Sequence, residues 1–543
     1  MSPRGSEPHL HDDRLPGPVP ESWASGSWAS ESWCARVVRQ SLLGIRELAP
    51  TADWGPDPDD QRFGDPAWSS VPGYRFVLQV YLTWRRLVLA GAEAPYLPAR
   101  RRQQVQFLAQ VLTEALAPTN VLPGNPAALR RALDTRGTSL VRGAGNLLDD
   151  LARRRGRPAK IAPGSYRLGE NLAATPGRVV HRDDLVEVLQ YEPQTAEVHQ
   201  VPLLLVPAWV NKFYIYDLAP GRSLVEWAVR AGFTVFAISQ RDPTPDQTDL
   251  GLDEYLSRVP LRALDVVREI TGSERAHLVG VCAGGLLAAI TAAWLTAGGE
   301  PGVASLTLLM SALDHTPPDG GDQPMAEEIA FLTRALSRGD GLVDGGRIGV
   351  LFDLLRSRDT VWQPLVAGWL LGERPKPFDI WAWSEDGIDV PRVLFEQTLR
   401  IAADNALARG RLRVGGRPVD LSAVAQDAFV VAGLRDHIAP WETVYRSARL
   451  LGGDVAFHLV PSGHVGGIVN PPRPQADYRI CADGLPPDPR VWSARATPRH
   501  ESWWVAWSRW LAPRSGPRVP RRATGSARHP AGAPAPGEYA RSR

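Results

Sequence analysis

A glycine-rich segment near the middle of the chain joins two stretches of different character. The run His277 to Val279 is strand-like and the run Leu286 to Trp294 suits a helix, with Gly280-Val281-Cys282-Ala283-Gly284-Gly285 between them. A sharp strand-to-helix turn brings backbone and neighbouring side chains close together, so glycines on both sides of the central residue have a physical reason. Such a turn presents its central side chain at the end of a sheet, and we interpret Cys282 as a nucleophile. A buried structural cysteine is the alternative.

Cysteine suits this position chemically. The dipole at a helix N-terminus favours the thiolate, which is the form that attacks a carbonyl or a thioester. The backbone amide of the next residue, Ala283, is then placed to bind the oxyanion that forms. The chain has only three cysteines, Cys34, Cys282 and Cys481. That number is too small for a disulfide framework and fits a reducing compartment.

The sequence after about residue 195 alternates short apolar runs with helical stretches, which is typical of βα units around a parallel sheet. We expect strands at residues 203–206, 234–238, 277–279, 306–309, 429–431 and 456–460. We also expect a helix from Ser223 to Arg230 that ends near Gly232. Between about 312 and 420 the alternation lapses into helical and irregular sequence, which predicts a cap inserted over the sheet.

An acid and a histidine follow the nucleophile, each directly after a predicted strand. Asp436 follows the run 429–431, and His464 follows the run 456–460. The chain order nucleophile, acid, histidine is that of the α/β-hydrolase fold, so we predict this fold and a triad of Cys282, Asp436 and His464. His437 is a rival base, but adjacent side chains on an extended segment point apart. His277 and His458 lie inside predicted strands, and we expect them in the core.

The first predicted sheet strand ends in Val206-Pro207-Ala208-Trp209-Val210-Asn211-Lys212. This is the position from which the fold supplies its second oxyanion-hole amide, and we assign that role to Val210. Asn211 either contacts substrate or fixes its own turn. Lys212 is either a solvated surface charge or part of the site.

The ends of the chain differ from its middle. Residues 1–60 have no sustained period and predict a disordered lead-in, and residues 514–543 carry seven arginines against one acid and predict a disordered basic tail. Residues 61–195 are expected to form a mainly helical domain, ahead of a catalytic domain over 196–513. Apolar residues recur there at spacings of three and four, from Phe76 to Leu87 and from Val105 to Leu116. This stripe either packs between domains or meets a lipid-like or polymer surface.

Composition excludes several classes of protein. The 61 basic and 59 acidic residues leave a net charge of +2, which gives no electrostatic reason to bind nucleic acid. No window reaches the roughly 18 apolar residues of a membrane span, and the first residues lack the apolar core of a signal peptide. We therefore expect a cytoplasmic protein without a transmembrane segment. Neither a metal site nor a cofactor is expected.

Several stretches resemble the poly(3-hydroxyalkanoate) synthases, and the likeness extends from about residue 61 to about 515. They include Phe63-Gly64-Asp65-Pro66-Ala67-Trp68, Ala117-Pro118-Thr119-Asn120, Gly169 to Gly177, Val206 to Asp217, Asp436 to Trp441, and Gly463-His464 through Asn470-Pro471-Pro472. Because the N-terminal helical region is present, the chain is similar to the long single-subunit kind. The resemblance gives Cys282 the role of acyl acceptor, His464 that of general base, and Asp436 that of third triad member.

The resemblance implies polymerisation of (R)-3-hydroxyacyl-CoA with release of CoA, a growing polyester chain and its granule surface as partners, and a homodimer. It also makes Trp362 a candidate for substrate binding. Three places depart from the family pattern: Gln240 in Ser239 to Pro243, Ser384 after Trp383, and Gln363-Pro364 after Trp362. All lie outside the triad and bear on the substrate pocket and cap.

Fold and triad alone do not decide whether water or an alcohol accepts the acyl group. A polyester depolymerase or a thioesterase is therefore the alternative enzyme. A granule-coating protein that binds polymer without chemistry is the alternative from another class, and the intact triad argues against it.

Overall fold

The computed structural model describes residues 55–57, 60–93, 99–316 and 333–542, and the lead-in expected over 1–60 lies almost wholly outside them. The chain forms two compact units, residues 1–95 and 96–543. Each unit is described separately below.

The described part of the first unit is helical. It contains η2 (Gln61–Phe63), α2 (Ala67–Ser70) and α3 (Pro72–Ala92). Phe63 packs edge-on against Trp68, with ring centroids 5.1 Å apart, and also contacts Tyr81 of α3. The helix predicted from Phe76 to Leu87 is therefore present. Its Phe76 and Val80 are exposed, whereas Leu78, Tyr81 and Leu82 are buried.

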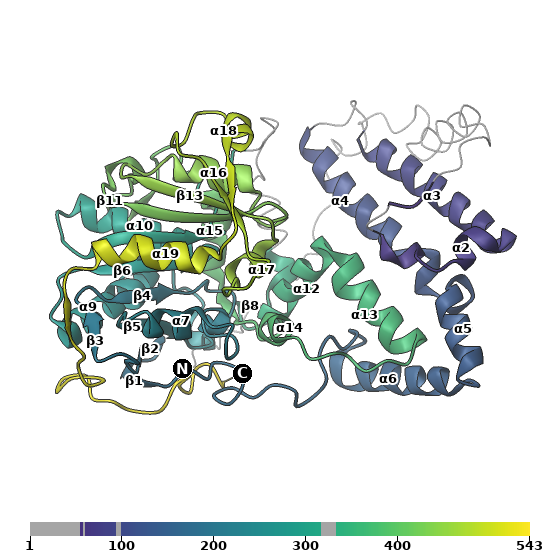
Figure 1. Ribbon diagram of the computed structural model, residues 1–543, viewed down its shortest axis with the longest axis horizontal. Coiled ribbons are helices and arrows are strands. Elements are labelled where there is room, and N and C mark those ends of the chain that lie inside the picture. Colours follow the sequence, from purple (N-terminus) through teal and green to yellow (C-terminus); the bar gives the residue numbers. More distant parts are fainter. Residues whose placement is uncertain (1–54, 58–59, 94–98, 317–332, 543) are drawn as a thin grey trace, which may run out of the picture. The chain divides into compact units, whose positions relative to one another are not determined.

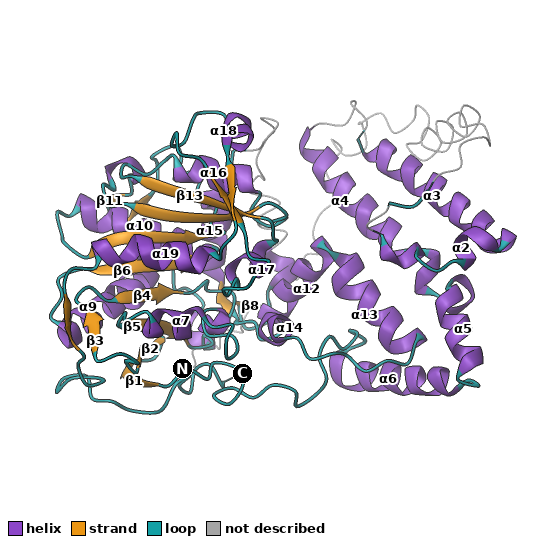
Figure 2. Cartoon of the chain, viewed as in Figure 1, coloured by secondary structure: helices purple, strands orange, loops and turns teal. Residues whose placement is uncertain are grey.

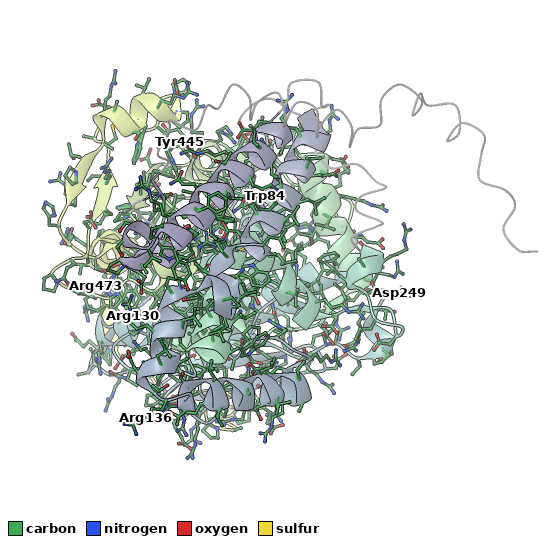
Figure 3. The ribbon with its side chains drawn as sticks, turned by 90° about the vertical axis from the view of Figure 1, so that its right-hand side faces the viewer. Trp84, Arg130, Arg136, Asp249, Tyr445 and Arg473 are labelled. Atoms are coloured by element: carbon green, nitrogen blue, oxygen red, sulfur yellow. The ribbon has the colours of Figure 1, made fainter. Side chains whose placement is uncertain are left out.

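The second unit begins with helices. These are α4 (Ala99–Ala115), η3 (Pro118–Asn120), η4 (Leu122–Gly124), α5 (Pro126–Asp134) and α6 (Thr138–Arg154). Asn125 caps α5 through its side chain. Arg136 and Gly137 both have positive φ and make the tight turn between α5 and α6, where Arg136 is exposed (Figure 3).

A ten-stranded sheet forms the centre of the second unit (Figure 2). Its order is β1-β2-β5-β4-β6-β7-β12-β13-β14-β15, and the strands from β5 to β13 are parallel to one another. Their bounds are β1 (Gly177–Arg182), β2 (Val186–Tyr191), β4 (Leu203–Val206), β5 (Val235–Gln240), β6 (Ala276–Val281), β7 (Val303–Leu309), β12 (Ala428–Gly433), β13 (Val455–Val460), β14 (Tyr478–Ile480) and β15 (Thr497–Arg499). All six strands expected from the sequence are among them.

Helices cover both faces of the sheet because the strand side chains alternate. Leu204 and Val206 of β4 belong to the core under α9, α10 and α16, whereas Leu203 and Leu205 belong to the core under α7 and α19. Successive side chains of a strand point to opposite faces, so near-continuous apolar runs are required where both faces are buried. Figure 1 shows α19 lying across the sheet.

The helices around the sheet have the following bounds: η5 (Phe213–Ile215), α7 (Leu224–Arg230), η6 (Pro245–Gln247), α8 (Leu252–Leu256), η7 (Ser257–Leu261), α9 (Arg262–Thr271), α10 (Ala283–Ala297), α15 (Arg392–Ala403), η10 (Leu421–Ala423), α16 (Trp441–Ala448), α17 (His464–Ile468), α18 (Pro489–Arg495), α19 (Trp503–Leu511) and η11 (Ala512–Arg514). The expected helix after Ser223 is α7. The Ser223 side chain caps it by accepting from the Glu226 amide, and Gly232 follows with a φ of 86°.

Residues between β7 and β12 form the insertion expected as a cap, and its described part is mostly helical. It holds β8 (Leu342–Val343), α12 (Gly345–Leu355), η8 (Arg358–Trp362), α13 (Gln363–Leu365), η9 (Val366–Leu370), α14 (Asp379–Ser384) and β9 (Val390–Pro391) ahead of α15, and the hairpin β10 (Arg413–Val414) and β11 (Arg417–Pro418) after it. Helix α6 packs on this insertion. Asn146 donates to the Gly368 carbonyl at 2.8 Å, and Trp369 donates to Asp150 at 2.8 Å.

The domain organisation differs in two details from the expected one. The region 61–195 is mainly helical as far as Arg154, and β1 and β2, which also lie within it, form one edge of the main sheet. The sequence did not predict these strands because neither is a continuous apolar run. β1 carries charged residues at its exposed positions, and β2 contains Glu187 and Gln190. In addition, the division into compact units falls after residue 95 rather than near 195.

The segment expected to be a disordered basic tail is instead folded onto the second unit, as Figure 1 shows in yellow. We call residues 515–542 the returning segment. Within it, β16 (Arg518–Pro520) pairs with β3 (Glu197–His199), and residues 532–535 add a further extended stretch beside β1. Its arginines find specific acceptors, such as the Leu168 carbonyl for Arg541 at 2.8 Å. Composition alone does not show whether arginines have such acceptors, so it could not predict that this segment folds.

No helix among the described residues is long and apolar enough to cross a membrane.

Candidate active site

Cys282 sits in the sharp turn between β6 and α10. Its φ of 52° and ψ of −121° lie outside the regions that ordinary residues favour. The Cys282 amide donates to the Leu309 carbonyl at 2.9 Å, so the end of β7 holds the turn in place. Backbone strain of this kind costs of order 1–3 kcal/mol and persists only where surrounding structure fixes it. The side chain is partly buried.

The three neighbouring glycines are needed because their surroundings leave no space. A Cβ on Gly280 would lie 2.5 Å from the Gly284 carbonyl oxygen, and one on Gly284 would lie 2.2 Å from the Val206 carbonyl oxygen. A Cβ on Gly285 would lie 1.9 Å from Ser311 Oγ. The spacing of glycines in the sequence thus follows from the close approach of α10 to β4 and β7.

Asp436 and His464 are brought together by neighbouring parallel strands. Asp436 follows β12, and His464 is the first residue of α17 after β13. His464 Nδ1 lies 2.7 Å from Asp436 Oδ2, and both side chains are buried. The other oxygen, Asp436 Oδ1, accepts from the amides of Ile438 at 2.8 Å and Ala439 at 2.9 Å. The carboxylate is therefore fixed on both sides, and His437 is exposed and takes no part in the pair.

Because Asp436 engages Nδ1, Nε2 is the ring nitrogen of His464 that remains available to Cys282, and both residues line the same cavity. Burial lowers the pKa of His464, but the charge of the Cys282 thiolate and the bond to Asp436 outweigh it and hold this pKa well above its ordinary value. The arrangement thus favours the protonated, positively charged form of His464 beside Cys282. A thiolate is the nucleophilic form of cysteine.

A cavity of about 150 Å³ opens beside these groups. Its walls are largely apolar and come from the sheet end, from α17 and from the insertion; the insertion contributes Gly345, Ile348, Gly349, Phe352, Asp353, Thr360, Trp381, Trp383, Ser384 and Gly387. Cys282, His464, Val210 and Asn211 also line it. The cavity can therefore hold an apolar acyl group against the sulfur.

The two amides expected to bind an oxyanion are free of protein acceptors. Among the described residues, neither the Ala283 amide nor the Val210 amide donates to another protein group. Tyr216 fixes the strand ends that carry them, because its hydroxyl donates to the carbonyls of Val206 at 2.9 Å and Val279 at 3.1 Å. Donors held without a partner are what an oxyanion requires.

Lys212 is not a solvated surface charge. Its side chain is buried, and its ammonium group donates to Asp242 and to two backbone carbonyls of the returning segment, each at 3.0 Å. Its carbonyl accepts from the indole of Trp383, a cavity residue, at 2.8 Å.

The remaining candidate for substrate binding, Trp362, does not line the cavity. It ends η8, and the neighbouring tryptophans Trp381 and Trp383 line the cavity instead. Of the three departures from the family pattern, only Ser384 reaches the wall; Gln240 is buried at the end of β5, and Gln363-Pro364 begins α13.

A charged cluster in the cavity wall was missed by sequence reasoning. Asp353 of α12 accepts from Lys160 Nζ at 2.5 Å and from Arg157 at 2.9 Å. The Lys160 ammonium also lies 4.9 Å from the ring centre of Trp381. One signal was available, because Lys160 and Lys212 are two of only three lysines in an arginine-rich chain. A compact ammonium fits a tight buried site where a guanidinium does not.

His277 and His458 are in the core, as expected. Burial lowers the pKa of His277 to about 3 and that of His458 to about 4, so both rings are neutral. No group of three or more His, Cys, Asp or Glu side chains in the described parts of the chain is arranged to hold a metal ion.

Comparison with known proteins gives two kinds of match. The family model described as Poly-beta-hydroxybutyrate polymerase (PhaC) N-terminus matches residues 59–228, and that of the alpha/beta hydrolase fold matches residues 201–471, which confirms the predicted fold.

Relatives match almost the whole chain. It is 38% identical to Poly(3-hydroxyalkanoate) polymerase 1 of Ectopseudomonas oleovorans, over 93% of this chain and 89% of that protein. Poly(3-hydroxyalkanoate) polymerase 2 of the same organism is 39% identical over 90% and 87% of the two chains. The Poly(3-hydroxyalkanoate) polymerase subunit PhaC of Cupriavidus necator is 35% identical over 89% and 83%.

Proposed function

This chain belongs to the poly(3-hydroxyalkanoate) polymerase family, and we propose that it polymerises (R)-3-hydroxyacyl-CoA into polyester with release of CoA. One observation supports the mechanism: His464, whose Nδ1 lies 2.7 Å from Asp436 Oδ2, lines the same apolar cavity as Cys282. These three residues form the proposed catalytic triad.

Acylation begins at the sulfur. The Cys282 thiolate attacks the thioester carbonyl carbon, and the carbonyl oxygen takes the negative charge beside the amides of Ala283 and Val210. The bond from that carbon to the CoA sulfur then breaks. His464, which carries the proton, gives it to the departing CoA thiolate, so an acyl-cysteine and neutral His464 remain.

Elongation uses the same histidine as a base. Neutral His464 takes the proton from the 3-hydroxyl group of a monomer or of the growing chain. The hydroxyl oxygen attacks the carbonyl carbon of the acyl thioester of the other partner, the carbon–sulfur bond of that thioester breaks, and an ester bond forms. The displaced thiolate is again stabilised by the protonated histidine. Asp436 orients the ring and stabilises its positive charge in both steps.

Cysteine suits the transfer better than serine would. Exchange of an acyl group between CoA and Cys282 replaces one thioester by another, so the acyl group stays activated. A serine ester would be a poorer donor to an alcohol. No cofactor is needed, because the CoA thioester brings its own activation.

The apolar cavity also favours an alcohol over water as acceptor. Residues of the insertion, among them Phe352 and Trp381, supply much of the apolar wall of the cavity. Excluding water limits hydrolysis of the acyl-cysteine. Asn211 lines the cavity beside Val210, which supports its proposed contact with the substrate.

We further propose that the enzyme works in the cytoplasm, as a homodimer, at the surface of its own polyester granule. Large apolar side chains on the helices before the sheet support the surface contact. Leu133 is 79% exposed, Val141 74% and Leu148 66%. Exposed apolar groups of this density mark interaction surfaces.

The test is CoA release from three-carbon to twelve-carbon 3-hydroxyacyl-CoAs, with recovery of the polymer. We expect CoA and polymer from the wild-type protein and neither from Cys282→Ala. Cys481→Ala is the matched control, because Cys481 is also a partly buried thiol but lies outside the cavity. Labelled acyl groups should be found on Cys282.

The outcomes separate the alternatives. CoA release with free 3-hydroxy acid and no polymer would show a thioesterase, and release of monomers from added polyester would show a depolymerase. Granule formation by Cys282→Ala at the wild-type level would show a binding protein without chemistry.

A further inference from the structure

Lys212 is a buried cation that the proposed chemistry does not use. Its side chain is 1% exposed, yet it keeps three hydrogen bonds, to Asp242 Oδ2 and to the carbonyls of Tyr539 and Ser542. A buried ammonium is costly unless each of its donors finds an acceptor. Two of the three acceptors here belong to the returning segment, 327 and 330 residues further along the chain.

The returning segment is held at this place by contacts of its own. The amides of Glu538 and Tyr539 both donate to the buried carboxylate of Glu187 at 3.1 Å. The Tyr539 ring lies 5.8 Å from the guanidinium groups of both Arg182 and Arg241. Gly537 has a φ of 82°, and a Cβ there would lie 2.2 Å from Glu187 Oε2. The segment therefore docks in one fixed conformation.

The backbone of Lys212 belongs to the wall of the active site. Val210 and Asn211, directly before it, line the cavity, and the Val210 carbonyl accepts from the Ile388 amide at 3.2 Å. The Lys212 carbonyl accepts from Trp383, which lines the cavity from the insertion. Anchoring the Lys212 side chain thus fixes a loop that carries the Val210 amide, the proposed oxyanion donor.

A second connection runs through Asp242. Its Oδ1 accepts from the Asp389 amide at 3.1 Å, and the Asp389 side chain accepts from the amide of Gly345 at 2.9 Å. Gly345 begins α12 and lines the cavity. Lys212 and Asp242 therefore join the returning segment to both sides of the cavity.

We propose that residues 531–542 of the returning segment are a positioning element for catalysis. By holding Lys212, they set the Val210–Asn211 loop in the geometry that stabilises the transition state. The proposal rests on the proposed function for its kinetic effect, but the placement of the loop can be measured without substrate.

The first experiment removes the residues after Pro530 and measures both the rate of CoA release and the hydrogen exchange of the Val210–Asn211 loop. A chain ending at Pro530 is compared with full-length protein and with Lys212→Met. Both changes should lower kcat for CoA release by about 10-fold to 100-fold, the range for a misplaced oxyanion donor, with KM altered by no more than about twofold. Hydrogen exchange of amides 208–213 should accelerate in both. Lys376→Met is the control, because Lys376 is exposed.

The second experiment adds residues 531–542 back as a synthetic peptide. Added to the chain ending at Pro530, it should restore kcat and slow the exchange of amides 208–213 in a saturable way. A peptide with Gly537→Ala should restore neither. In the shortened chain carrying Lys212→Met, the peptide should leave kcat low, which a purely stabilising role does not predict.

Wild-type kcat and wild-type exchange in the shortened chain would overturn the proposal. So would equal rescue with and without Lys212, or failure of the peptide to restore either readout in a shortened chain that retains the wild-type melting temperature. If full-length protein releases no CoA from any substrate, the proposed function fails, and the exchange of amides 208–213 still decides whether the segment positions the loop.

Discussion

Gly284 is a residue at which the turn around Cys282 leaves no space for a side chain, because the nearest atoms belong to the backbone of β4 and the residue after it. In Gly284→Ala the new Cβ would meet the Val206 carbonyl oxygen at 2.2 Å, and neither backbone can move without disturbing β4 or α10. We expect the free energy of unfolding to fall by about 1–3 kcal/mol and CoA release to be lost. Urea unfolding followed by circular dichroism measures the first effect.

Gly145→Ala is the matched control for this substitution. Gly145 lies on an exposed face of α6, and no atom lies within 4 Å of its added Cβ. That change should raise the free energy of unfolding by about 0.4–1 kcal/mol. Equal effects of the two substitutions would contradict the steric argument.

Asp436→Asn should separate the two proposed half-reactions. A thiol ionises far more readily than an alcohol, so acylation of Cys282 depends less on the histidine than activation of the 3-hydroxyl does. We expect single-turnover acylation to be partly retained and steady-state elongation to be slowed more severely. Equal losses in both steps would instead show that Asp436 serves to orient His464 throughout.

Among single residues, the sequence predicts the functional side chains that follow the ends of strands. It does not predict side chains that are distant in the sequence and come into contact only in the folded chain. Cys282, Asp436 and His464 each stand directly after an apolar run, so their chain order locates them. Asp353 and Lys160 lie 193 residues apart and adjoin no recognisable turn. The sequence offers no rule for which tryptophan of a helical insertion points inward, and Trp381, not Trp362, lines the cavity.

Two strands carry neutral histidines whose protonation is tied to unfolding. His277 of β6 lies between Ser305 at 2.7 Å and Ser515 at 2.9 Å, and burial lowers its pKa to about 3. Below pH 6.5 the unfolded chain binds a proton at this position and the folded chain does not. The free energy of unfolding should therefore fall with pH from 6.5 towards 3, by up to about 1.4 kcal/mol per pH unit.

His277→Gln should reduce the slope of unfolding free energy against pH by the contribution of one histidine. Urea unfolding at pH 7 and pH 5 measures it, with the exposed His500→Gln as control. His458 of β13 should act in the same direction down to about pH 4. A His277→Gln protein with an unchanged slope would show that His277 does not titrate on unfolding.

Elements were predictable where burial on both faces forces a continuous apolar run. The central strands β4, β5, β6, β7, β12 and β13 meet that condition, and all were expected; β2 is buried along its length but carries Glu187 and Gln190, so its sequence is not a continuous apolar run. Edge strands do not, since one side of β1 is charged and β14 and β15 are short. The fold of the returning segment was not predicted for a related reason. Backbone hydrogen bonds and arginine contacts hold it on the sheet, and composition does not reveal such contacts.

For the whole molecule, the second unit holds every residue of the candidate site. A chain of residues 96–543 should therefore fold on its own, unfold in a single transition and retain acylation of Cys282. Thermal unfolding followed by circular dichroism and labelling with acyl-CoA check this. Loss of cooperative unfolding in that chain would show that residues 1–95 are required for the fold of the second unit.

The docking of residues 531–542 has a consequence for the order in which the protein is completed during synthesis. The chain emerges from the ribosome N-terminus first, so Cys282, Asp436 and His464 are all exposed before the residues that anchor Lys212. On the proposed role of Lys212, a nascent chain carries its triad beside a loop that is not yet fixed. On the proposed function, such a chain should turn over acyl-CoA about 10-fold to 100-fold more slowly until residues 531–542 have emerged, which would limit polyester growth on a chain still being translated.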